Sequence, residues 1–205
     1  MMLLLGVLAW LLVPGLQREA ALALDDARPV IENERATVWD FTWTRGVPAA
    51  MERRSSNSVW ISVAPMPGDV RYWAIGAERQ APQSPDAPAR TIVIDLKDHP
   101  VEPLENKTRF PNAFPRPGAK KALENDKVVV WDYTWTLGQP TPMHFHDKDV
   151  VVVYLKDGKL ASTTPDGKRV VNPLSVGKTT FNARNRVHTE TLAEGQSRAI
   201  ITEFK

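Results

Sequence analysis

The protein has 205 residues, with 26 Lys plus Arg against 24 Asp plus Glu, 17 prolines and no cysteine. This length allows one domain or two small ones with a buried core, and a net charge of +2 is too small to indicate a nucleic-acid partner. Because cysteine is absent, disulfides and thiolate chemistry are excluded, and any bound metal must be held by histidine, carboxylate or another oxygen donor. The many prolines predict turns and few long helices.

The amino terminus has the pattern of a targeting segment. Residues 2–16 form an apolar run without a charge, which is shorter than the run of about 18 residues expected of a membrane span. Ala-Leu-Ala at 21–23 fits a signal-peptide cleavage site. We therefore expect residues 1–23 to be a signal peptide and the mature chain to be exported, periplasmic or secreted, with no stable membrane insertion. No Lys or Arg precedes the apolar run, so an uncleaved anchor or a misassigned start is the alternative.

An internal repeat organises the rest of the chain. Residues 32–51 and 124–143 are identical at eleven of twenty positions at a shift of 92, and residues 90–97 match 198–205 at a shift of 108. The second copy is therefore 16 residues longer. A period of this size predicts two copies of one small domain, because it is too long for a solenoid repeat. The predicted boundaries are 24–97 and 120–205 for the two copies, and 98–119 for a Pro-rich linker or wrapping arm.

Both copies carry strand patterns. Residues 128–136 (VVVWDYTWT) are dense in β-branched and aromatic side chains, and residues 150–155 (VVVVYL) are a short apolar run that ends at a Lys-Asp-Gly turn. Residues 164–167 (TPDG) are a second turn of the hairpin kind. Short strands separated by turns, with no convincing amphipathic helix, predict an all-β fold, either a barrel or a sandwich.

Two tryptophan doublets occupy equivalent positions in the two copies. Trp39 and Trp43, like Trp131 and Trp135, are four residues apart, which places each doublet on one face of a strand. We predict that they pack inside a barrel or between the copies. Stacking on a ligand is the alternative.

Three of the four histidines form a pattern suited to metal binding. His144 and His146 are two residues apart, so on a strand both imidazoles point to one face and can bind one ion. The pair follows Gly138 by six residues and precedes an apolar strand and Gly158, and His188 comes after a further strand and turn.

This order resembles the two motifs of the cupin superfamily: a Gly, five residues, His-x-His, then a Glu and a Gly, followed later by a Gly, a Pro-x-Gly turn and a His. The resemblance implies two double-stranded β-helix (jelly-roll) barrels packed as an intrachain pseudo-dimer, that is, a bicupin. It also implies a divalent metal ion inside the second barrel, with His144, His146 and His188 as ligands. Neutral imidazoles suit Fe, Zn, Mn, Ni or Cu, so the identity of the metal stays open.

The sequence departs from the family pattern at specific positions. The family's Glu falls on Val151, which cannot coordinate, and Ala183 and Asn185 stand where the second motif has Pro and Gly. What remains is a site of three histidines. It resembles the minority of cupins, some iron dioxygenases among them, that bind metal without the Glu.

Charged residues near His188 are candidates for catalysis and substrate binding. Glu190 follows His188 by two residues, on the same strand face, and we predict that it is a general base or a fourth ligand. The alternative is a barrel-mouth carboxylate paired with Arg184 or Arg186. These two arginines are candidates to bind a substrate carboxylate, or else they are solvated loop residues.

The first copy serves as an internal control. Glu52, Arg54 and Gln80 stand at the positions of the three histidines, so all three ligands are missing together. We therefore predict that the first copy is a degenerate cupin-like repeat without metal ligands and acts as a structural partner.

These patterns favour an exported metal-dependent enzyme that acts on a small molecule by oxygenase- or isomerase-type chemistry. The alternatives are a non-catalytic small-ligand-binding or structural cupin, and a cupin barrel that binds no metal. The sequence allows a homodimer, and it does not name a substrate.

Overall fold

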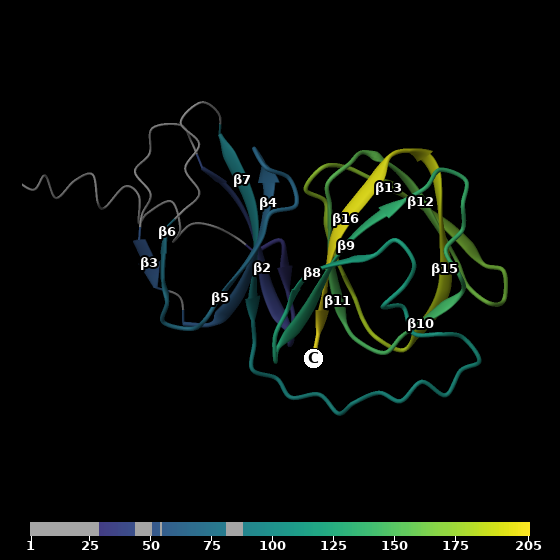
Figure 1. Ribbon diagram of the computed structural model, residues 1–205, viewed down its shortest axis with the longest axis horizontal. Coiled ribbons are helices and arrows are strands. Elements are labelled where there is room, and N and C mark those ends of the chain that lie inside the picture. Colours follow the sequence, from purple (N-terminus) through teal and green to yellow (C-terminus); the bar gives the residue numbers. More distant parts are fainter. Residues whose placement is uncertain (1–28, 44–50, 54, 81–87) are drawn as a thin grey trace, which may run out of the picture.

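The computed structural model describes residues 29–43, 51–53, 55–80 and 88–205 (Figure 1). These residues form sixteen β-strands and no helix, which confirms the all-β prediction. Accordingly, no helix that is long and apolar enough to cross a membrane occurs among them. The predicted signal peptide, residues 1–23, lies outside the described residues.

The first half of the chain forms a five-stranded antiparallel sheet in the order β1-β2-β7-β4-β5. The bounds of its strands are β1 Ile31–Glu32, β2 Ala36–Trp43, β4 Asn57–Ala64, β5 Val70–Trp73 and β7 Ala89–Leu96. A separate two-stranded sheet contains β3 (Met51–Arg53) and β6 (Glu78–Gln80).

The second half forms a five-stranded and a four-stranded sheet that enclose one apolar core. The five-stranded sheet has the order β8-β9-β16-β11-β14, and the four-stranded sheet has the order β10-β15-β12-β13. Apolar side chains from both sheets form one buried cluster, as expected for a jelly-roll barrel. The bounds are β8 Lys120–Glu124, β9 Val128–Trp135, β10 His144–His146, β11 Val150–Tyr154, β12 Gly158–Thr163, β13 Arg169–Leu174, β14 Thr179–Asn182, β15 Arg186–Gly195 and β16 Ser197–Phe204.

The two five-stranded sheets have the same strand order, as the repeat predicts. The WDFTWT strand β2 pairs with β7, and the WDYTWT strand β9 pairs with β16. Even the register agrees, because Asp40 lies opposite Ile92 and Asp132 lies opposite Ile200. These are repeat-equivalent positions at the shifts of 92 and 108.

The extra residues of the second copy are found in one hairpin. Strands β12 and β13 pair with each other and add two strands beside β15, and the described residues of the first half contain no counterpart of them. The second sheet of that half therefore has only β3 and β6 within the described residues. A closed barrel in the first half, and with it the full bicupin pair, stays a prediction.

The two five-stranded sheets pack face to face, so that the two halves lie side by side (Figure 1). One buried cluster contains side chains from both sheets. Because strand side chains alternate between faces, each sheet contributes every second residue to this layer. The fully buried members include Val38, Val59, Ile61, Ile92 and Ile94 from the first half, and Val128, Val130, Val151, Val153 and Ile200 from the second.

Two arginines at repeat-equivalent positions cross between the halves. Arg90 forms an ion pair of 2.6 Å with Asp40, and its guanidinium also donates to the carbonyl oxygen of Val176 in the second half. Arg198 forms an ion pair of 2.8 Å with Asp132 and donates to the carbonyl oxygen of Pro67 in the first half. The matched contacts indicate an approximate two-fold relation between the two sheets.

The tryptophans of the second copy pack inside its barrel, as predicted. Trp131 and Trp135 are buried in the interior cluster, and the Trp131 indole donates to Glu203 Oε2 at 2.8 Å. In the first copy the equivalent Trp39 donates to Asp95 Oδ2 at 2.8 Å. The side chain of Trp43 lies outside the described residues.

The predicted linker ends as part of the second barrel. It passes along one side of the molecule (Figure 1) and then pairs with β10, since Phe145 N donates to Pro111 O at 2.8 Å and Ala113 N donates to Phe145 O at 2.7 Å. Phe114 stacks on Trp131 inside the barrel, with ring centroids 5.2 Å apart. The structural boundary of the second half therefore lies near residue 111, earlier than the predicted residue 120.

Candidate metal centre

Strands β10 and β15 bring the three predicted histidine ligands together. The two strands are antiparallel, and His144 lies directly opposite His188. His146 is one two-residue step along β10, so it shares the inward face with His144. All three side chains are buried. We call His144, His146 and His188 the three-His cluster.

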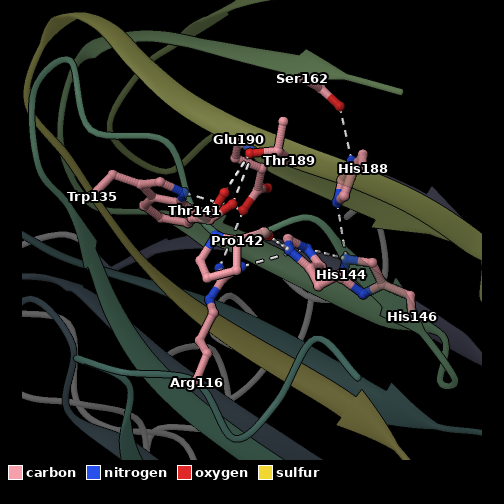
Figure 2. Close-up of polar contacts among 10 residues, drawn as sticks. All are labelled: Arg116, Trp135, Thr141, Pro142, His144, His146, Ser162, His188, Thr189 and Glu190. Carbon is pink, nitrogen blue, oxygen red and sulfur yellow. Dashed lines mark hydrogen bonds and ion pairs between the residues drawn. The ribbon is translucent and has the colours of Figure 1, made fainter. Parts of the chain in front are cut away.

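The Nε2 atoms of the cluster converge on one point (Figure 2). The Nε2 atom of His146 lies 3.2 Å from that of His144 and 3.0 Å from that of His188. One nitrogen from each of the three rings lies within 4.8 Å of the others. A strand pair is well suited to this convergence, because its register fixes which side chains face each other.

The Nδ1 atoms of two rings are engaged on the side away from the cluster centre (Figure 2). His144 Nδ1 donates to the carbonyl oxygen of Pro142 at 2.8 Å, and His188 Nδ1 lies 2.8 Å from Ser162 Oγ on β12. The first bond places the proton of His144 on Nδ1 and leaves the lone pair of Nε2 directed at the cluster. Such outer hydrogen bonds orient imidazole ligands in metal sites.

Burial keeps the cluster in the neutral form that binds metals. Desolvation is the largest cause of a lowered pKa for all three imidazoles, and it lowers the pKa of His188 to about 4. Neighbouring guanidinium groups, Arg186 and Arg116, lower these pKa values further. At neutral pH the imidazoles are therefore unprotonated, as a metal ligand must be.

The donor set fits a divalent transition metal. Two nitrogens that bind one zinc ion at about 2.0–2.1 Å each lie at most about 4.2 Å apart. The Nε2 atom of His146 meets this limit with both partners, at 3.2 Å from His144 Nε2 and 3.0 Å from His188 Nε2. Three neutral imidazole nitrogens suit Fe, Zn, Mn, Ni or Cu. The three-His cluster can therefore hold a metal ion, and its identity is not fixed by the ligands.

Part of the chain is similar in sequence to a known protein. No family model matches the chain. The "Beta-alanine degradation protein BauB" of Pseudomonas aeruginosa is 36% identical over 66 residues, and the match covers 32% of this chain and 68% of that protein.

Several solved structures resemble this fold. A cupin domain from Bordetella pertussis Tohama I matches with a TM-score of 0.40 at 24% identity, over 48% of this chain and 98% of its own. The Cupin 2 conserved barrel domain protein from Leptotrichia buccalis matches with a TM-score of 0.48 at 13% identity, over 87% and 88%. AerE from Microcystis aeruginosa matches with a TM-score of 0.57 at 10% identity, over 87% and 97%, so this likeness extends over both halves. By sequence the chain belongs to the same family as BauB, and its fold is the cupin fold.

The sequence count places the family's Glu at Val151, but the side chain of Val151 does not face the barrel interior. Val151 is fully buried between the two five-stranded sheets and so faces away from the barrel interior. Its neighbours Val150 and Val152 face inward and line the cavity. The inward-facing place that the missing Glu would need is therefore Val150 or Val152, because strand side chains alternate.

Glu190 lies inside the barrel, close to the cluster but outside the ligand set. Its Oε2 atom accepts hydrogen bonds from Arg116 Nη2 and Trp135 Nε1, both at 3.2 Å (Figure 2). Both hydrogen bonds go to Oε2, and Oε1 accepts none from the described residues. Burial alone raises the pKa of Glu190, but the Arg116 guanidinium and the other polar neighbours outweigh it and hold the pKa below its ordinary value.

The two predicted substrate arginines have different positions. Arg186 lies opposite His146 on β15 and lines the cavity. Arg184 does not line it, since its guanidinium donates to the carbonyl oxygen of Glu102 in the linker and its backbone N–H donates to Asp149. Of the two, only Arg186 is placed to contact a molecule in the barrel.

The cluster opens into a cavity of about 200 Å³ inside the second barrel. One part of its wall is apolar and aromatic, and the other carries charged and polar side chains. The apolar lining is Phe114, Trp135, Val150, Val152, Tyr154, Leu160, Leu174 and Ile201, and the polar lining is Arg116, His146, Ser162, Asn172, Lys178, Thr180, Asn182, Arg186, His188 and Glu190.

Sequence reasoning missed Arg116, which is central to the site. Its side chain is only 6% exposed, and its guanidinium lies over the rings of Phe114 and Tyr133, 4.6 and 4.1 Å from their centroids. It also lies 3.5 Å from His144 Nε2. Arg116 stands between two prolines of the predicted linker, two residues after Phe114, and no periodic pattern in this segment indicates that its side chain enters the barrel.

The first copy's counterparts of the cluster lie outside the described side chains. Glu52 and Gln80 belong to β3 and β6, of which only the backbone is described, and Arg54 is not described. The pairing places Arg79 opposite Glu52, so Arg79, not Gln80, holds the pairing position that His188 has opposite His144.

Proposed function

We propose that this cupin is a metal-dependent enzyme that acts on a small molecule, by oxygenase- or isomerase-type chemistry. The observation that carries the proposal is the convergence of the Nε2 atoms of three buried, neutral imidazoles. Two of these rings are also oriented by contacts of their Nδ1 atoms, with Pro142 O and Ser162 Oγ. Three protein ligands leave positions free at the ion, which distinguishes catalytic from structural sites. The name of the relative BauB refers to the degradation of β-alanine, a small molecule, and this agrees with the size of the cavity.

The residues around the cluster have separate roles in the proposal. The bound ion supplies Lewis-acid polarisation of a substrate oxygen, or dioxygen activation if it is iron. Glu190 holds or accepts a proton at Oε1, while Arg116 and Trp135 fix the carboxylate through Oε2. The aromatic and aliphatic wall of the cavity excludes water from the reacting groups.

The proposal extends to the whole chain. Residues 1–23 are a signal peptide, so the mature protein is exported, periplasmic or secreted. The first copy, residues 24–97, is a degenerate cupin repeat that supports the second, and the pair makes up a bicupin. The shared strand order of the two sheets supports this arrangement, and the mass in solution decides whether the chain also forms a homodimer.

A non-catalytic binding protein is the second candidate, and one observation favours it. The carboxylate of Glu190 is already engaged by a guanidinium, and its pKa lies below the ordinary value. A carboxylate in this state is a weaker base than one raised toward neutral pH. In this alternative the barrel captures a small ligand and the ion organises the pocket.

Metal analysis of the full chain, produced without a polyhistidine tag, tests the proposal. We expect about one transition-metal ion per chain in the wild type, and its loss in His144→Ala and His188→Ala. The matched control is His99→Ala, because His99 is an exposed histidine, 48% accessible, in the linker. Oxygen-uptake and isomerisation screens on the metal-loaded protein then separate the enzyme from the binding protein. A wild type that binds no metal in any loading condition contradicts both.

A further inference from the structure

The charges that line the cavity do not cancel. Three cations line it, Arg116, Lys178 and Arg186, against a single carboxylate, that of Glu190. Glu190 is already paired with Arg116 at 3.2 Å. Among the described residues, neither Lys178 nor Arg186 forms an ion pair with a carboxylate within 4 Å. The cavity therefore presents a net positive charge even before a metal ion is bound.

Arg186 lies on the same strand as the predicted metal ligand His188 and the carboxylate of Glu190. Arg186, His188 and Glu190 follow one another at two-residue steps on β15, so their side chains share the inward face. Each step is a rise of about 6.5–7 Å. A molecule held at Arg186 therefore lies within a few bonds of the centre of the three-His cluster.

The guanidinium of Arg186 is only partly used by the protein. Its Nε atom donates to the carbonyl oxygen of Ala183, and its two Nη groups make no hydrogen bond to described residues. A half-buried guanidinium has lost part of its hydration, and a bound anion restores what was lost. The planar pair of N–H groups at one edge matches the two oxygens of a carboxylate.

We propose that the molecule bound in this barrel is a short-chain carboxylate whose carboxylate group is held by Arg186. This inference rests on the proposed function for the presence of a substrate, but the anion site itself needs no metal. Lys178 adds a second positive charge at the cavity wall. The aliphatic wall of Val150, Val152 and Leu160 takes the carbon chain, and this apolar surface favours a carboxylate over phosphate, which carries polar oxygens on every side.

Binding of butyrate to the full chain tests the proposal, with butyramide as its uncharged match and inorganic phosphate as the competing anion. Calorimetry is carried out on the zinc-loaded and on the chelator-treated protein. We expect butyrate to bind both forms, and to bind the chelator-treated form at least about tenfold more tightly than butyramide or phosphate does. Arg186→Gln weakens butyrate binding at least about tenfold and leaves the zinc content unchanged. Arg186→Lys, which keeps the charge but not the planar fork, gives an intermediate loss.

Arg169→Gln is the control, because Arg169 is exposed at the start of β13 and does not line the cavity. It leaves butyrate binding unchanged. Equal affinities for butyrate and butyramide, tighter binding of phosphate, or wild-type affinity in Arg186→Gln each overturn the proposal. Failure of the metal-dependent function has a different signature, in which zinc is not retained while the chelator-treated protein still binds butyrate through Arg186.

Discussion

His144, His146 and His188 are prepared as ligands by their surroundings as well as by their spacing. Two histidines at alternate positions of a strand share a face in any sheet, but they bind metal only if they are neutral and correctly oriented. Here burial lowers their pKa values, and the Pro142 carbonyl and the Ser162 hydroxyl hold two of the rings. Pro142 belongs to a loop that is fixed to β15, since Thr141 N donates to Glu190 O at 2.8 Å.

Replacing Glu190 by Gln tests whether this residue serves the chemistry or the ion. The amide keeps the shape and can still accept from Trp135, but it cannot take a proton. We expect metal content to stay nearly intact and turnover to fall by about 10²-fold or more, the usual contribution of a general acid or base. Metal analysis and steady-state kinetics give the two readouts.

The matched control for this variant is Glu194→Gln, on the same strand but exposed and paired with Lys159. It leaves both readouts unchanged. Strong metal loss in Glu190→Gln would instead make Glu190 a ligand, and unchanged metal and turnover would remove it from the site.

Glu203 gives a prediction on pH dependence. Burial raises the pKa of its carboxyl above the ordinary 4.5, although the Trp131 indole acts in the opposite direction. The folded state therefore binds this proton more tightly than the unfolded state does, and the stability it contributes is full below pH 4.5 and lost as the pH rises through the folded pKa. Glu203→Gln removes this loss, because the amide oxygen still accepts from Trp131.

We expect the melting temperature of Glu203→Gln to match that of the wild type at pH 4 and to exceed it at pH 8, by about 2–4 °C for each kcal/mol recovered. Thermal unfolding at a series of pH values measures the difference between the two proteins. A difference in melting temperature that does not change with pH would show that burial does not raise the pKa of Glu203.

At the scale of elements, the two crossing arginines join the halves at equivalent turns. Gly68 and Gly177, which lie under them, have φ of +94° and +82°. In each case the guanidinium packs so closely on the glycine that a Cβ would stand within 2.4–2.6 Å of it. A side chain at either glycine would therefore displace the guanidinium, and the positive φ of both residues favours glycine in any case.

Removing one of these arginines should weaken the contact between halves. Arg198→Gln loses the paired hydrogen bonds to Asp132, of 3.0 and 2.8 Å, and the bond to Pro67 O. We expect the free energy of unfolding to fall by about 1.5–3 kcal/mol, the range for hydrogen bonds to charged groups. Denaturant titration measures this free energy of unfolding.

The control is Arg71→Gln, which breaks the exposed ion pair with Asp69 and should change the free energy of unfolding by less than about 0.5 kcal/mol. Equal effects of the two variants would mean that the crossing contact adds no stability.

The sequence predicted the elements that follow periodic patterns and missed those that depend on tertiary placement. The repeat located β2 and β9, and the His-x-His spacing located β10. The assignment of the missing Glu to Val151 was wrong about the face, since counting along the chain does not show which face of the strand is inward, and only the fold shows that Val150 points inward. Arg116 could not be placed because a Pro-rich segment has no periodicity that indicates what it packs against.

At the scale of the whole molecule, the interface between the halves is packed like a hydrophobic core. Fully buried valine and isoleucine side chains from both sheets form it, and the buried ion pair of Arg35 with Asp149, at 3.4 Å, joins the halves at one edge. Each half would expose a continuous apolar sheet face if it stood alone. The first half therefore contributes to the site indirectly, by covering the outer face of the sheet that carries β11 and β16.

A fragment of residues 111–205 should keep the three-His cluster but not the monomeric state. Its uncovered face would contain Val128, Val130, Val151, Val153 and Ile200, an apolar surface that associates in water. We expect a dimer or larger species by light scattering, and precipitation at lower temperature than the full chain. A monomeric fragment as stable as the full chain would show that the interface contributes nothing to the second barrel.

The central claim is that the three-His cluster holds a metal ion. A crystal structure of the zinc-loaded full chain, with anomalous diffraction recorded on both sides of the zinc absorption edge, tests it most directly. The account predicts one anomalous peak at about 2.0–2.1 Å from a nitrogen of His144, His146 and His188, with no carboxylate of Glu190 among the ligands. A zinc-loaded crystal with no peak at the cluster, or with zinc bound only elsewhere, would contradict it.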